Sequence, residues 1–169
     1  MQPLQVPPQV AVPQPPPVRF AGFWRRFVAH IIDQIIVGIA AFVVFIPGLA
    51  LLGVGIGAGI MEESESAIGL ILAAIAAYLV AIVLIVVGQW LYFALMESSS
   101  KQATVGKMAL GIVVTDLSGN RISFGRATGR YFGKIVSGMI LCIGYFMAGF
   151  TERKQALHDI MSSCLVVLR

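Results

Sequence analysis

Two long stretches without charge dominate the pattern of hydrophobic and polar positions. In the first, no charged residue occurs over 34–61, and Pro47 and Gly48 interrupt the apolar run. Proline lacks the backbone N–H that a helix interior needs, so it ends or kinks a helix. The pattern therefore predicts a membrane span at about 24–46, because roughly 20 apolar residues cross a hydrocarbon core of about 30 Å. A second helical piece that frays before the acidic residues is favoured for the glycine-rich stretch 53–59.

The second stretch predicts another span. Residues 67–96 carry no charge and end near Trp90 and Tyr92, and Trp and Tyr are enriched where membrane meets water. The connection between the two stretches contains Glu62 and Glu63 but no Lys or Arg. The chain therefore has two predicted transmembrane helices joined by an acidic connection.

The pattern changes after the second span. Residues 111–115 predict a short strand, and 116–120 predict a turn. A third hydrophobic region follows at about 127–150, but its charge-free part is shorter than the roughly 20 residues that a span needs. The region is therefore predicted to be either re-entrant or spanning. A return to the same side would let 165–168 pair with 112–114, which would cover strand edges that are otherwise bare.

Positive charges set the predicted orientation, because cytoplasmic flanks carry an excess of Lys and Arg. Arg25 and Arg26 precede the first span, and the segment 97–134 is basic. The N-terminus and this segment are therefore predicted to be cytoplasmic. The side of the C-terminus stays open, since a third span would place it outside and a return would place it inside. The predicted fold class is an α-helical membrane protein with two transmembrane helices, a third re-entrant or spanning helical region and a small cytoplasmic strand pair.

Composition supports this class and excludes others. Hydrophobic residues make up 58% of the 169 residues and charged residues 12%, against about 45–50% and about 25% in soluble domains. A soluble globular domain and a disordered chain are both excluded on that basis. Residues 1–19 hold most of the prolines and predict a disordered cytoplasmic tail. Residues 20–169 then form a single membrane domain.

Three polar side chains share one face of the first predicted helix. Arg26, His30 and Asp33 stand at helical spacing, and a carboxylate in hydrocarbon needs a partner, water or a proton. The candidate charge partners of Asp33 are Arg26, Lys107, Arg130 and Lys134. One interpretation is a cation or proton site on Asp33 with His30 titrating beside it. The other is a buried ion pair that orients the helices.

The rest of the sequence gives few indications of catalytic, metal-binding or nucleic-acid-binding chemistry. Asp159, after His158, is predicted to cap a helix or to anchor the C-terminal segment through Arg130 or Lys107. No catalytic residues, cofactor or metal site are predicted, because the two cysteines form no CxxC motif and only two histidines are present. The basic segment is better explained by anionic lipid headgroups than by nucleic acid. The chain is therefore not expected to be an enzyme.

Several short motifs resemble one family of membrane proteins. Residues 22–33 (GFWRRFVAHIID) are similar to the opening of the RDD family of bacterial membrane proteins, which is named for one arginine and two aspartates. The segment 104–107 (TVGK), the 116–119 turn and the 157–159 segment (LHD) also resemble its pattern, in the expected order. The resemblance covers about residues 20–168.

The resemblance assigns Arg26 as the arginine and Asp33 and Asp159 as the two aspartates, while His30 departs from the pattern. It implies a multi-pass protein of the bacterial inner membrane. The family's molecular function is largely unassigned, with transport among the suggested roles.

Two functional hypotheses follow. The first is a non-enzymatic structural, assembly or regulatory membrane subunit, in which the charges hold the fold together. The alternative is a proton-linked cation transport unit built on Asp33, which would need an oligomer because three short helices cannot enclose a pathway alone. Expected partners are anionic lipids and further copies of the chain or other membrane proteins.

Overall fold

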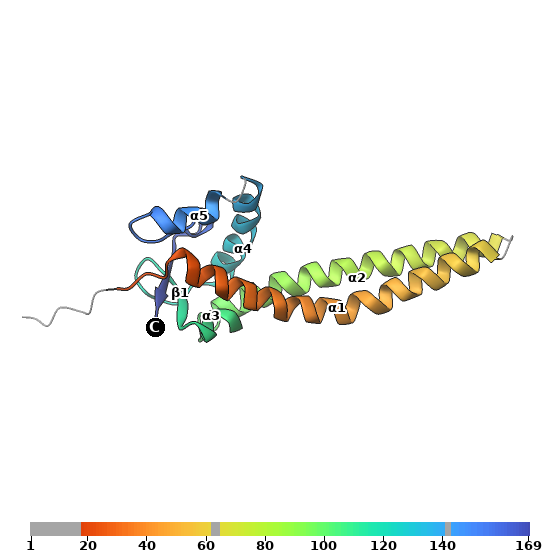
Figure 1. Ribbon diagram of the computed structural model, residues 1–169, viewed down its shortest axis with the longest axis horizontal. Coiled ribbons are helices and arrows are strands. Elements are labelled where there is room, and N and C mark those ends of the chain that lie inside the picture. The colour runs from red at the N-terminus through yellow and green to blue at the C-terminus, as the bar shows by residue number, and fades with distance from the viewer. Residues whose placement is uncertain (1–17, 62–64, 141–142) are drawn as a thin grey trace, which may run out of the picture.

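A long helical hairpin with a small domain at one end makes up the described part of the molecule (Figure 1). The computed structural model describes residues 18–61, 65–140 and 143–169. The arms of the hairpin are α1 (Phe23–Met61) and α2 (Glu65–Ser98). Both are long and apolar enough to cross a membrane, which confirms two of the predicted spans. The predicted proline-rich tail falls mainly on 1–17, and the residues Glu62 and Glu63 fall in the connection, all outside the described residues.

The predicted end of the first span at residue 46 is wrong. Helix α1 continues for 39 residues with Pro47 inside it. The reason lies in its packing against α2, which continues beyond the proline. A Cβ on Gly48 would lie 3.6 Å from the Cβ of Ala81, and one on Gly55 would lie 2.7 Å from the Cβ of Ala74. Such close approach stabilises helix pairs in lipid and holds α1 helical past the hydrogen bond that the proline removes.

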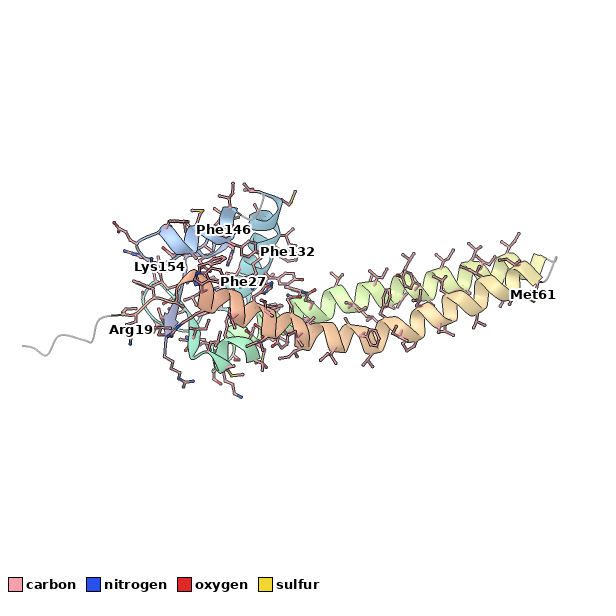
Figure 2. The ribbon with its side chains drawn as sticks, viewed as in Figure 1. Arg19, Phe27, Met61, Phe132, Phe146 and Lys154 are labelled. Carbon is pink, nitrogen blue, oxygen red and sulfur yellow. The ribbon has the colours of Figure 1, made fainter. Side chains whose placement is uncertain are left out.

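Apolar side chains point outward along the hairpin (Figure 2). Ile39 is 64% exposed and Phe42 is 63% exposed on α1, and Leu84 is 61% exposed on α2. In water, such a surface would aggregate, whereas in lipid it is the expected outer face. The chain is therefore a membrane protein with its hairpin embedded in the bilayer.

The small domain is organised around a two-stranded antiparallel sheet. Strand β1 (Ile112–Asp116) pairs with β2 (Cys164–Leu168), with Ile112 opposite Leu168. The predicted pairing of these two segments is confirmed. Phe20 forms a further bridge with Val167, so the residues just before α1 extend the same sheet. The buried core beneath it is formed by Ala21, Ala29, Ala94, Ile112, Val114, Ile122, Ala127, Cys164 and Val166.

Four shorter helices complete the described part of the domain. They are α3 (Val105–Ala109), α4 (Phe124–Met139), α5 (Ile143–Phe150) and α6 (Leu157–Met161). The third hydrophobic region corresponds to α4 and α5, which are bent by 103° relative to each other. Strand β1 precedes this bent pair and β2 follows it, yet the two strands are hydrogen-bonded. Both ends of the pair therefore lie at the same end of the hairpin, which favours the re-entrant alternative over a third span.

Candidate functional site

Asp33 is held by three uncharged donors. It is fully buried on α1, and its carboxylate accepts hydrogen bonds from Gly106 N at 2.7 Å, Thr104 Oγ1 at 2.5 Å and Tyr92 OH at 2.9 Å. The donors belong to α2 and to the start of α3. Asp33 therefore fixes α3 against both arms of the hairpin.

Gly106 makes this arrangement sterically feasible. A Cβ at this position would lie 2.1 Å from the carbonyl oxygen of Ala29 and 3.0 Å from the Cγ of Asp33. Any side chain would therefore push α3 away from α1 and lengthen the hydrogen bonds to Asp33.

The predicted ion pairs of Asp33 are wrong. Among the described residues, the four candidate cations Arg26, Lys107, Arg130 and Lys134 pair with Glu97 or Asp159, and none forms an ion pair with Asp33. The physical reason is that the backbone amide and hydroxyl groups around α3 already occupy the Asp33 oxygens. Arg26 and Asp33 share a helix face as predicted but belong to different clusters.

Glu97, in the last turn of α2, is a buried charge centre that the residue pattern does not predict. Its side chain is 1% exposed and faces three cations from two other helices. Lys107 Nζ lies 2.5 Å from Oε1, Arg130 Nε lies 3.2 Å from Oε2, and Lys134 Nζ lies 3.4 Å from Oε1. Burial lowers the pKa of Lys107 to about 8, although the Glu97 charge acts in the opposite direction. Glu97 directly follows the charge-free stretch 67–96, where a solvent-exposed charge is equally expected, so the residue pattern gives no signal of its buried role.

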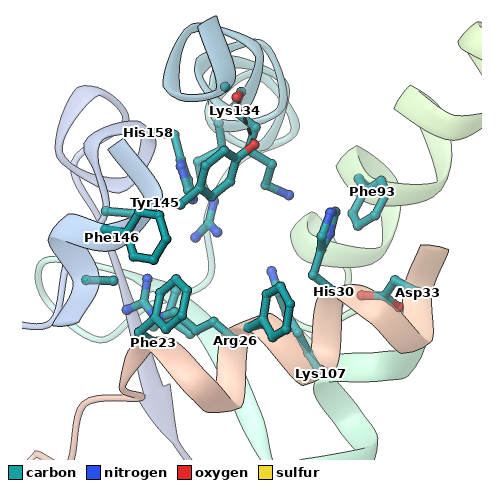
Figure 3. Close-up of a pocket in the computed structure, with 16 residues that line it drawn as sticks. Phe23, Arg26, His30, Asp33, Phe93, Lys107, Lys134, Tyr145, Phe146 and His158 are labelled. Carbon is teal, nitrogen blue, oxygen red and sulfur yellow. Dashed lines mark hydrogen bonds between the residues drawn. The ribbon is translucent and has the colours of Figure 1, made fainter. Parts of the chain in front are cut away.

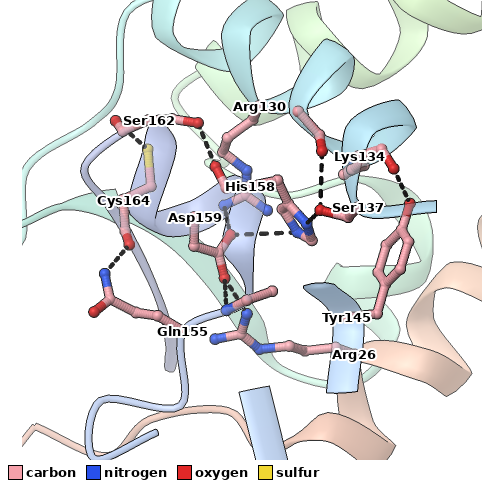
Figure 4. A network of polar contacts seen from close by, with 12 residues as sticks. Arg26, Arg130, Lys134, Ser137, Tyr145, Gln155, His158, Asp159, Ser162 and Cys164 are labelled. Atoms are coloured by element: carbon pink, nitrogen blue, oxygen red, sulfur yellow. Dashed lines mark hydrogen bonds and ion pairs between the residues drawn. The ribbon is translucent and has the colours of Figure 1, made fainter. Parts of the chain in front are cut away.

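Asp159 forms a second centre (Figure 4), and Arg130 links it to Glu97. Its carboxylate pairs with Arg26 of α1 and lies 3.2 Å from Arg130 Nη1 of α4. It also accepts a hydrogen bond from Ala156 N at 3.1 Å, at the start of α6. Burial alone would raise the pKa of Asp159, but the charges of Arg130 and Arg26 hold the pKa well below its ordinary value. Asp159 thus both caps α6 and anchors the C-terminal segment through Arg130, as predicted.

The two histidines lie in different surroundings. His158 is buried, with its Nδ1 3.3 Å from Ser137 Oγ, and packs on Gly133, where a Cβ would lie 3.0 Å from the His158 Cβ. Burial lowers the pKa of His158 to about 3, against the opposing charge of Asp159. His30 is exposed on α1.

The network carries more positive than negative charge. Four cations meet two carboxylates, Glu97 and Asp159, in these ion pairs. Within the described part of the chain, Arg26 Nη2 is buried without a hydrogen-bond partner, and the Arg130 nitrogens that face the carboxylates make ion pairs without hydrogen-bond geometry. A buried donor without an acceptor is costly, so the cluster retains capacity to bind a further acceptor.

A cavity of about 480 Å³ lies beside this network (Figure 3). It is bounded by the first turns of α1 and by α2, α3, α4, α5 and α6. Cationic side chains project into it among aromatic rings. The lining residues with charged, imidazole or aromatic side chains are Phe23, Arg26, Phe27, His30, Asp33, Phe93, Lys107, Arg130, Lys134, Tyr145, Phe146 and His158. In the residues that the structure describes, no group of three His, Cys, Asp or Glu side chains is placed to hold a metal ion.

Comparisons with known proteins agree with the motifs noted in the sequence. The profile of the RDD family matches residues 20–163. The Bacillus subtilis protein YxaI, described as uncharacterized, is 37% identical over 151 residues, which cover 88% of this chain and 97% of YxaI. The uncharacterized membrane protein YteJ of Bacillus subtilis is 27% identical over 154 residues, which cover 88% of this chain and 80% of YteJ. No solved structure matches the chain.

Proposed function

The chain belongs to the RDD family of membrane proteins, and from this premise we propose that it is a non-enzymatic structural, assembly or regulatory subunit of the bacterial plasma membrane. The hairpin anchors the subunit, and the small domain is the part that other molecules contact. Further copies of the chain or other membrane proteins are the proposed partners.

One observation carries this proposal: the buried charges are occupied in joining elements. Glu97 joins α2 to α3 and α4, Asp159 joins α6 to α1 and α4, and Asp33 joins α1 to α2 and α3. Breaking a buried ion pair is strongly destabilising. We infer that these three buried carboxylates hold the small domain against the hairpin.

The small domain is proposed to lie in the cytoplasm. The Lys and Arg residues of the segment 97–134 lie in or next to this domain, and such residues favour the cytoplasmic side. Because β2 pairs with β1, the C-terminal segment lies on that side too. A reporter active only in the periplasm should be inactive when fused after Arg169, and an active fusion would overturn this orientation.

The alternative, a proton-linked cation transport unit acting as an oligomer, has weaker support. The Asp33 carboxylate accepts three hydrogen bonds and has no exposed surface. The adjacent cavity is lined by four cations, which repel a permeating cation.

A flux assay separates the two functions. The purified protein in lipid vesicles, under an imposed sodium or potassium gradient, should move no more protons than protein-free vesicles do. Cation-driven proton flux that Asp33→Asn abolishes, with the variant still folded, would overturn the structural proposal in favour of transport.

A further inference from the structure

We propose that the cavity between α1, α4 and α5 binds an acidic amphiphile, with the phosphate or carboxylate headgroup on the buried cations and the acyl chain along the aromatic walls. This inference goes beyond the structural role and does not depend on it, since ion pairs could hold the domain together whether or not the cavity is filled.

The charge of the cavity selects an anion. Arg26, Lys107, Arg130 and Lys134 all line it, and among the described residues the one lining carboxylate is Asp33, whose oxygens accept hydrogen bonds from neutral donors. The carboxylates that pair with the cations, Glu97 and Asp159, lie outside the lining. The cavity is therefore lined mainly by positive side chains, while the carboxylates that pair with them do not line it.

Arg26 is the clearest example of a cation with unused hydrogen-bonding capacity. Its Nη1 pairs with Asp159 and its Nε donates to the Ala21 carbonyl at 2.8 Å, but its Nη2 is buried with no hydrogen-bond partner among the described atoms. Arg26, Lys107 and Lys134 line the same cavity from α1, α3 and α4 (Figure 3). A planar guanidinium beside ammonium groups suits the oxygens of a phosphate or carboxylate.

The walls of the cavity select an apolar tail. The rings of Phe23 and Phe146 stack with centroids 5.0 Å apart, and Phe27 and Phe93 complete the aromatic lining. Phe27 is 44% exposed and Phe146 is 52% exposed, so the lining continues to the outer surface of the molecule. A small inorganic anion would leave this apolar surface uncovered, whereas an acyl chain would cover it.

The surroundings of the cavity place it within reach of membrane lipid. Ile31 of α1 is 41% exposed, Ile135 of α4 is 52% exposed and Ile143 of α5 is 56% exposed, so the helices that bound the cavity have apolar outer faces. Its volume of about 480 Å³ lies within the range of about 300–1,000 Å³ that is typical of small-molecule sites. A phospholipid and a free fatty acid share the required chemistry.

Binding of short-chain probes tests the proposal directly. The full-length protein in neutral detergent is titrated calorimetrically with dioctanoyl phosphatidylglycerol, octanoate, dioctanoyl phosphatidylcholine and inorganic phosphate. The phosphatidylglycerol should bind at least about tenfold more tightly than the phosphatidylcholine, because both carry a phosphate but the choline adds a positive charge that the cavity cations repel. Octanoate binding as tightly as phosphatidylglycerol would identify the fatty acid as a source, and weaker octanoate binding would identify the phospholipid.

Two matched pairs of variants localise the site. Lys134→Gln should weaken phosphatidylglycerol binding by about tenfold, whereas Arg126→Gln, on the same helix but outside the cavity, should leave it unchanged. Gly138→Leu fills part of the cavity and keeps every charge, while Gly129→Leu adds the same side chain to α4 away from the cavity. The Gly138 variant should lose binding and the Gly129 variant should keep it.

Three results would overturn the proposal. They are equal affinity for phosphatidylglycerol and phosphatidylcholine, inorganic phosphate binding as tightly as the phospholipid, and equal losses from the Gly138 and Gly129 variants. Because Gly138→Leu leaves the ion pairs intact, the test does not depend on whether Lys134→Gln folds.

Discussion

Replacement of Glu97 by Gln is the substitution that we expect to disturb the buried charge network most strongly. Glutamine keeps the size of the side chain and one acceptor oxygen but removes the negative charge. Three cations, Lys107, Arg130 and Lys134, then remain within reach of an uncharged group that is nearly inaccessible to solvent. The change therefore converts a paired cluster into one with uncompensated buried positive charge.

The magnitude follows from burial and geometry. Breaking a buried ion pair by neutralising one partner costs about 3–5 kcal/mol. Glu97 is 1% exposed and its closest cation lies at 2.5 Å, so we expect a loss of unfolding free energy of about 3–5 kcal/mol. Adding Lys107→Met to Glu97→Gln removes one of the stranded charges and should restore part of the loss.

Tryptophan fluorescence provides the assay. Trp90 of α2 donates to Thr128 Oγ1 of α4 at 3.3 Å, so its emission reports separation of the two helices that Glu97 joins. Denaturant titration in neutral detergent gives the unfolding free energy of each variant. Glu152→Gln, at an exposed glutamate, is the matched control and should behave as wild type. Equal unfolding curves for the Glu97 and Glu152 variants would show that the Glu97 charge does not stabilise the fold.

Three further outcomes are expected in the same unfolding assay. Gly106→Ala should lower the unfolding free energy by about 2–3 kcal/mol or more through overpacking, because the new Cβ would lie 2.1 Å from the Ala29 carbonyl oxygen. Gly129→Ala is the control and should not destabilise, because nothing lies within 4 Å of its Cβ. Equal effects of the two substitutions would contradict this prediction. The unfolding free energy should fall as the pH drops from 6.5 toward about 3. In this range His158 is protonated in the unfolded chain but stays neutral in the native state, which gives a slope of up to about 1.4 kcal/mol per pH unit. His158→Gln should flatten that slope, and an unchanged slope would count against the assignment. A double-mutant cycle of Arg26→Gln and Asp159→Asn should give a coupling of about 0.5–3 kcal/mol, and additive losses would exclude their pairing.

The spans and the strand pair could be predicted because each depends on a local pattern. The stretch 67–96 lacks charge, and a helix is the simplest way to satisfy its backbone in lipid. The segments 112–114 and 165–168 are short and rich in β-branched residues, and their pairing is confirmed. In both cases the chemistry of neighbouring residues determines the structure.

The continuation of α1 through Pro47 could not be predicted in the same way. A proline weakens a helix locally, but its effect here is offset by contacts with α2, such as the approach of Gly48 to Ala81. Those contacts join residues far apart in the chain. The sequence alone does not say which face of each helix they occupy.

The pairing of the buried charges could not be predicted either. The sequence indicated that Arg26, Asp33 and Asp159 matter and that cations would surround them, but not which cation meets which carboxylate. Docking of α3 supplies Asp33 with neutral donors, and docking of α6 supplies Arg26 with Asp159. Glu97 was missed because a carboxylate just after an apolar stretch resembles an ordinary solvated boundary.

The unfolding free energy of Asp33→Asn is the measurement that tests the structural account most directly. Asparagine keeps the shape of the side chain but removes its charge, so the hydrogen bonds from Gly106, Thr104 and Tyr92 are no longer charge-assisted, and the Thr104 hydroxyl has to accept where it donated. Hydrogen bonds to a charged group are each worth about 1 kcal/mol or more above neutral ones, so we expect the unfolding free energy to fall by about 1–3 kcal/mol. An Asp33→Asn protein as stable as wild type would contradict the claim that Asp33 pins the small domain to the hairpin.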